Sequence, residues 1–322
     1  MEEKKSMIWS EILNQVFIIS IIAGAIRIGT PLIMGAIGET FVERSGVMNL
    51  GIEGLMLIGA LSGFAGAYAT GNVWIGVLAA IIIGGLGALL MAFLSVTLTA
   101  QQAIAGIAIW MLFDGMAVFA NKVSYGRMVQ LPTITGFSPL NIPYLSQLPI
   151  IGQILFSHNI MVYVGILIVV FSNIILFKTA IGLKIRSVGE NPLAADSLGI
   201  NVSQIRFLCV VIGGMLAGLG GAYITLSELH LFSNYVISGR GWIAFTIVYF
   251  GRWKPYGVLI AGLFFGFVEA LQLRLQSVLG TAVPYQLLLM LPYVLTILVL
   301  TLSSGKQVAP EALARPYRRG EK

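Results

Sequence analysis

Residues 184–200 read Lys184-Ile185-Arg186-Ser187-Val188-Gly189-Glu190-Asn191-Pro192-Leu193-Ala194-Ala195-Asp196-Ser197-Leu198-Gly199-Ile200, the longest polar island between two strongly apolar blocks. Asn191 suits a helix N-cap, because its side-chain oxygen can accept an N–H of the first turn. Pro192 suits the first helical position and Gly199 a left-handed stop. The pattern predicts a helix of about two turns, roughly 10 Å long. A helix this short is marginal alone in water, so we expect it to dock against another protein.

The composition indicates a polytopic membrane protein. Of the 322 residues, 57% are apolar and 10% are charged. Repeated apolar blocks of about 20 residues can each cross a hydrocarbon core of about 30 Å, whereas a β-barrel would show alternation. The net charge of +6 reflects basic residues in loops and in the tail, so we do not expect nucleic-acid binding. The single cysteine, Cys209, excludes a disulfide framework and a cysteine metal site.

The apolar blocks predict an all-α bundle of membrane helices in one domain, residues 1–322. Expected spans cover residues 16–37, 73–98, 103–120, 159–177, 207–226, 235–251, 256–275 and 284–302. Residues 38–70 are interrupted by acids and glycines, and they are too short for two ordinary spans, so we expect short or broken helices there. Irregular backbone survives at membrane depth only where protein or a water-filled cavity covers it. Interrupted helices also recur where transporters bind substrate.

Charge in the short loops predicts the orientation. Lysine and arginine mark cytoplasmic loops, and they flank the island at Lys178, Lys184, Arg186 and Arg206. The basic tail, residues 303–322, falls on the same side. For the N-terminus, one continuous span over residues 38–70 would place it outside and a broken one inside; Lys4 and Lys5 favour the inside.

No catalytic constellation is visible. His158 and His230 read as surface residues of outer loops, and no glycine-rich phosphate loop of the ATPase type occurs. We therefore expect neither an enzyme nor a cofactor, and ATP hydrolysis must come from a partner chain.

Polar residues inside apolar blocks are candidates for a translocation path. A charge at a helix centre costs about 2.5–3.5 kcal/mol on insertion scales, and such residues usually face a bundle interior or a cavity. Asn49 and Glu53 are the leading pair, predicted to lie one turn apart on one helix face. Trp110 and Trp242 could stack a ring or could serve packing only. The remaining candidates are Gln101, Gln102, Asp114 and Glu269, for which a buried hydrogen bond or an ion pair, for instance with Arg27, is the alternative.

Three motifs carry a family resemblance: residues 188–200 with the pattern VGENPxAADxxGI, residues 43–54 (ERSGVMNLGIEG), and residues 239–245 (GRGWIAF) followed by 250–255 (FGRWKP). Together they resemble the permease subunit of bacterial ABC importers, in the nucleoside and simple-sugar branch related to ribose and branched-chain amino acid permeases. The resemblance covers about residues 16–302. It implies about ten spans and a cytoplasmic coupling helix within 184–200. It also implies coupling contacts at Gly189, Glu190, Asn191, Pro192, Ala194, Ala195, Asp196 and Gly199.

The resemblance further implies a multi-pass protein of the bacterial cytoplasmic membrane that works by alternating access. The implied partners are an ABC ATPase subunit, a second and different permease subunit, an extracytoplasmic substrate-binding lipoprotein and a small neutral solute. A nucleoside is the expected solute and a simple sugar is the alternative. An ion-coupled secondary transporter, which would titrate Glu53, Asp114 and Glu269, is the alternative of a different class.

Overall fold

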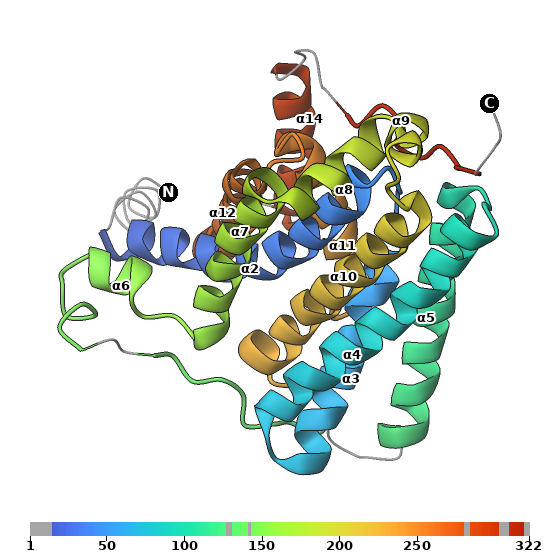
Figure 1. Cartoon of the computed structure of the whole chain (residues 1–322). Helices are drawn as coiled ribbons and strands as arrows, with labels where there is room; N and C mark the ends of the chain where they lie inside the picture. Colours follow the sequence, from blue (N-terminus) through green and yellow to red (C-terminus); the bar gives the residue numbers. More distant parts are fainter. Residues whose placement is uncertain (1–14, 127–130, 141–142, 280–283, 303–308, 319–322) are drawn as a thin grey trace.

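The computed structural model describes residues 15–126, 131–140, 143–279, 284–302 and 309–318 (Figure 1). Within them the chain is helical, and its only β-type pairing is two isolated bridges, Thr133 with Leu231 and Pro139 with Asn159. This confirms the all-α prediction. The helices are α2 (Gln15–Arg44), α3 (Ile52–Thr70), α4 (Val73–Ala92) with a π-helical turn η1 (Phe93–Thr97), α5 (Gln102–Tyr125), α6 (Ile151–Leu155), α7 (Ile160–Lys178), α8 (Ala180–Glu190), α9 (Pro192–Ser197), α10 (Val202–Tyr223) with a π-helical turn η2 (Ile224–Leu229), α11 (Arg240–Phe250), α12 (Pro255–Leu279), α13 (Tyr285–Leu289) and α14 (Leu291–Leu302).

Seven helices of the described chain are long and apolar enough to cross a membrane, so the predicted count of about ten is not confirmed. The predicted spans at 73–98, 103–120, 159–177, 207–226 and 256–275 correspond to α4, α5, α7, α10 and α12. The span expected at 235–251 is only the 11-residue α11, about 16 Å at 1.5 Å per residue. The span expected at 284–302 is divided at Met290 into α13 and α14.

The predicted interruption within residues 38–70 is present, but the helices on its two sides are not short. α2 continues for 30 residues to Arg44, and α3 is a full helix of 19 residues. Only residues 45–51 are irregular, and they fold back beside α2: the Asn49 N–H donates to Glu39 Oε1 at 2.9 Å. A Cβ on Gly35 would lie 3.6 Å from Ile52 Cδ1, so the first residue of α3 packs beside Gly35 of α2. Gly35 lies nine residues before the last residue of α2, which is about 13 Å along the helix. Most of this irregular stretch is buried, so protein covers it, as the bilayer requires.

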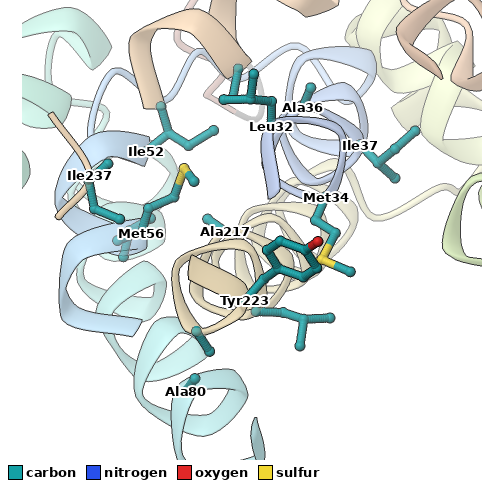
Figure 2. Close-up of a cluster of buried hydrophobic side chains, with 14 of the residues drawn as sticks. Leu32, Met34, Ala36, Ile37, Ile52, Met56, Ala80, Ala217, Tyr223 and Ile237 are labelled. Atoms are coloured by element: carbon teal, nitrogen blue, oxygen red, sulfur yellow. The ribbon is translucent and has the colours of Figure 1, made fainter. Parts of the chain in front are cut away.

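The core forms around α10, which packs against α2, α3 and α4, while α12 packs along the other side of α2. Figure 2 shows Met34 of α2 beside the Tyr223 ring of α10, and Met56 beside Ile52 of α3 in the same buried cluster. Small residues let the backbones approach: a Cβ on Gly221 would collide with the Met56 carbonyl oxygen. Such contacts are how membrane helices associate in the absence of a hydrophobic drive between them.

Replacing Gly221 with alanine should therefore lower the apparent melting temperature of the purified protein clearly. The new methyl group has no space against the α3 backbone, and overpacking costs typically about 1–3 kcal/mol. Gly115→Ala on α5 is the matched control, because nothing lies within 4 Å of its Cβ position. Equal melting temperatures for the two variants in thermal unfolding would contradict the close α3–α10 contact.

The molecule has two distinct ends. We call the end that carries α8 and α9 the coupling end; the described C-terminal residues lie there too, far from the α3–α4 turn (Figure 1). α2 reaches it at Arg44, whose Nη1 lies 3.8 Å from Glu190 Oε1. α2 therefore begins toward the opposite end, where it contacts α6 (Figure 1). The predicted cytoplasmic N-terminus falls on residues 1–14, outside the described residues.

Candidate functional site

The N-terminus of α11 is the point where the candidate path residues converge. Glu53, near the start of α3, accepts hydrogen bonds from the backbone N–H groups of Gly239 at 2.7 Å and Gly241 at 2.6 Å. The first N–H groups of a helix have no partner within it, and a carboxylate there also meets the positive end of the helix dipole. A Cβ on Gly241 would lie 2.5 Å from Glu53 Cα, so the approach requires glycine. Glu53 thus fixes a helix end inside the membrane domain.

Arg240, between the two glycines, forms an ion pair with a second acidic residue, Glu269. Its Nη2 donates to Glu269 Oε1 on α12 at 2.7 Å, and both side chains are about one-fifth exposed. This pair corrects the suggestion that Arg27 is the ionic partner of a span acid. The α11 N-terminus is therefore fixed by its backbone to α3 and by its side chain to α12.

A cavity of about 390 Å³ opens beside this pair. We call it the α11 cavity. Its volume lies within the usual range of small-molecule sites, and a mostly apolar lining with a few polar groups is typical of them. Its polar lining residues are Ser233, Tyr235, Ser238, Arg240, Glu269 and Gln272.

Trp110 and Trp242 meet edge to face next to the Glu53 contact, with ring centroids 5.4 Å apart and planes at 90°. Both are half-buried. Asp114, one turn after Trp110 on α5, is exposed and interacts electrostatically with Glu53. An exposed acid within a span should face water or protein, because lipid gives it no partner.

The other predicted path residues are placed differently. Asn49 is 1% exposed, and its side-chain oxygen accepts the Gly51 N–H at 3.0 Å ahead of α3. Because α3 begins at Ile52, Asn49 and Glu53 do not share a helix face, and that expectation is wrong. Gln102 is buried and accepts the Met48 N–H at 2.8 Å, whereas Gln101 is exposed at the start of α5. Asn49 and Gln102 thus hold the irregular stretch in place.

The island of residues 184–200 contains the predicted short helix. The Asn191 side chain accepts the Ala194 N–H at 3.0 Å, Pro192 occupies the first turn of α9, and Gly199 has φ +81°. These capping predictions are confirmed. The sequence reading missed α8, which occupies residues 180–190 immediately before it.

Several predicted coupling residues point inward. Ala195 is 2% exposed and packs with Val188 and Val202, and a Cβ on Gly189 would collide with the Arg44 carbonyl oxygen. The exposed face of the helix instead carries Leu193 and Leu198, at 51% and 82% exposure. Sequence reasoning missed both leucines, although a leucine in a polar loop helix was a usable signal. Glu190, Asn191 and Ala194 are exposed, as are Pro192 and Asp196 in part.

The described tail, residues 309–318, lies along the same end. The Ala312 N–H donates to the Gly189 carbonyl at 2.9 Å, and the Ala314 N–H to the Gly46 carbonyl at 3.2 Å. Buried Arg206 binds the carbonyl groups of Ser45 and Arg315, at 3.1 and 2.9 Å. The tail therefore connects α8, through Gly189, with the residues that lead into α3. Of the predicted basic tail residues, Lys306, Arg319 and Lys322 lie outside the described residues.

Comparisons with known proteins agree with this architecture. The family model for the permease component of branched-chain amino acid transport systems matches residues 15–300. The chain is 40% identical to the guanosine ABC transporter permease protein NupQ of Bacillus subtilis, over 96% of this chain and 100% of the relative. It is 36% identical to the nucleoside ABC transporter permease protein NupC of Lactococcus lactis, over 91% and 94%.

A solved ABC transporter assigned to the metal-chelate type, in an inward-facing conformation, shares the fold with a TM-score of 0.52. The match covers 91% of this chain and 90% of that one at 17% identity. The seven apolar helices and the family match over residues 15–300 lead to one conclusion: this chain belongs to the integral-membrane permease family of the branched-chain amino acid transport systems.

Proposed function

We propose that the chain is the transmembrane subunit of an ABC importer for nucleosides in the bacterial cytoplasmic membrane, forming one transmembrane domain over residues 1–322. The carrying observation is its 40% identity to a guanosine permease along the whole of that relative. Alternating access moves the solute without covalent chemistry. A substrate-binding lipoprotein delivers it, and a separate ATPase supplies the energy.

The α9 face is the proposed ATPase contact. Leu193 on α9 and Leu198 at its C-cap are exposed in the segment between two spans, and burying a leucine contributes about 1.5–3 kcal/mol. Ala195 and Gly189 pack on the buried side of this segment, and Gly199 ends the helix. Displacement of α9 would reach α3 through the tail contacts at Gly189 and Gly46.

The α11 N-terminus is the proposed centre of the path. Trp110, Trp242 and Asp114 present rings and a carboxylate beside Glu53, and aromatic faces suit a nucleobase. Gln101 contributes an amide from the start of α5, and Glu269 faces the α11 cavity. A second permease subunit completes the path across the exposed face of α5.

A sugar is the second candidate solute. The chain is 34% identical to a permease assigned to glucose transport in Haloferax volcanii, over 94% of this chain and 98% of that one. Uptake of labelled guanosine by cells carrying the full transporter decides between the two: excess unlabelled adenosine or guanosine should compete and excess glucose should not. Uptake of labelled glucose without uptake of labelled guanosine would overturn the nucleoside assignment.

Cross-linking tests the proposed ATPase contact. A benzophenone maleimide attached to Leu198→Cys should form an adduct with the ATPase subunit, because this side chain is 82% exposed. Ala195→Cys is the matched control: it lies three residues earlier but is 2% exposed and should give no adduct. The native Cys209 is fully buried and should stay unlabelled. Adducts from neither position, in a complex that contains the ATPase, would contradict the proposed docking face.

A further inference from the structure

A second polar cavity, of about 470 Å³, lies next to the α11 cavity at the opposite end from α9. We call it the outer vestibule, the cavity lined by Arg27, His158, Asn159, Ser227, Glu228 and His230. His158 and Asn159 precede α7, and Ser227 and His230 close the far end of α10, whereas α8 and α9 join the other ends of these two helices. By the lysine and arginine distribution this end faces the outside.

The vestibule wall is built from an unusual helix turn. η2 is a π-helix over Ile224–Leu229, followed by His230 with φ +57°. π-helical turns are rare and occur frequently at functional sites. The loop between α5 and α6 covers this turn. In it the Phe137 N–H donates to the Leu226 carbonyl, and the Ile134 N–H to the His230 carbonyl, both at 2.9 Å. The turn is thus held in place from outside.

Two buried polar atoms of this wall have no hydrogen-bond partner among the described residues. They are Ser227 Oγ and His230 Nε2. Ser227 is 8% exposed as a residue. An unpaired buried polar atom costs about 1–3 kcal/mol, so a hydrogen bond from a molecule in the vestibule to either atom would be favourable.

The vestibule is lined by basic and acidic side chains. Arg27 and Glu228 line it, and Arg240 enters from the shared wall with Glu269 bound to it. Burial lowers the pKa of His158 below its ordinary value, so this imidazole is an uncharged hydrogen-bonding group at pH 7. The vestibule therefore offers both hydrogen-bond donors and acceptors, which suits a ligand with several hydroxyl and amide groups.

We propose that the outer vestibule is a second binding site for the transported solute, a neutral molecule rich in hydroxyl and amide groups, which occupies it before it reaches the α11 cavity. The two cavities share Leu229, Arg240 and Leu273, so they adjoin directly. Ser227 Oγ, His230 Nε2 and the Glu228 carboxylate bind the hydroxyl and amide groups of the solute. The inference rests on the proposed function, because it takes its solute to be the transported one.

Protection of an introduced thiol tests this site in the assembled transporter. An impermeant methanethiosulfonate reagent, applied from outside, should modify Leu229→Cys, because Leu229 is 45% exposed and lines both cavities. Guanosine at ten times its dissociation constant should slow this modification about tenfold, as simple competition requires. Ser124→Cys, on α5 and outside both cavities, is the matched control, and guanosine should leave its rate unchanged.

His230→Cys provides a second position, should Leu229→Cys fail to support uptake. Wild-type transport of guanosine together with a thiol at these positions that does not react, or that guanosine does not protect, would overturn the vestibule site alone. A wild-type complex that takes up no nucleoside would instead overturn the proposed function.

Discussion

Replacing Glu53 with leucine should reduce ATP-dependent nucleoside uptake to background while the subunit still reaches the membrane with its ATPase. Glu53 accepts the N–H groups of Gly239 and Gly241. Without it both groups are unsatisfied inside the membrane domain, at about 1–3 kcal/mol each. The α11 N-terminus, with Arg240 and Trp242, should then lose its fixed position beside the path.

Glu53→Gln provides the graded comparison. Its single amide oxygen can accept one of the two N–H groups, while its NH₂ group faces the other as a second donor, so uptake should be intermediate. Uptake and recovery of the complex are measured on the same membranes. Full uptake by Glu53→Leu would make this contact dispensable, and loss of the complex would make it a folding contact.

Replacing both Leu193 and Leu198 with glutamate should prevent the ATPase from copurifying with the permease. Two buried leucines contribute together about 3–6 kcal/mol, which corresponds to at least about a hundredfold in affinity. Both side chains are exposed in the isolated chain, so its fold should not suffer. The control is Leu131→Glu, similarly exposed but in the loop at the opposite end. An intact complex in the double variant would place the ATPase contact elsewhere.

Local features of this fold could be predicted from the sequence. Asn191, Pro192 and Gly199 define the ends of α9 because capping depends on backbone groups within a few residues. The apolar blocks likewise predict α4, α5, α7, α10 and α12, since span length follows bilayer thickness.

Features that depend on partners far away in the sequence could not be predicted. Ala195 is buried because Val188 and Val202 pack on it, and no local pattern reveals which side of a short helix docks. Glu53 was recognised as a candidate, but its partners are 186 and 188 residues away. In the sequence, the acids Glu39 and Glu43 indicate that the helix is interrupted where they occur. In the structure Asn49 and Trp253 donate hydrogen bonds to these acids, so α2 continues past both.

The Arg240–Glu269 pair could be predicted from the sequence only in part. Arg240 lies within the motif of residues 239–245, but the motif alone assigns it no role, because its partner Glu269 lies on a different helix. An arginine at the edge of one span and an acid inside another are visible in the sequence. Only the packing of α11 against α12 selects this pair instead of Arg27.

The most direct test of the central claim is guanosine uptake into proteoliposomes that contain this chain with its permease partner, ATPase and binding protein. We predict uptake with ATP on the ATPase side, none with a non-hydrolysable ATP analogue, and none with a proton or sodium gradient alone. Uptake driven by an ion gradient without ATP hydrolysis would contradict the account, since the chain would then be a secondary transporter.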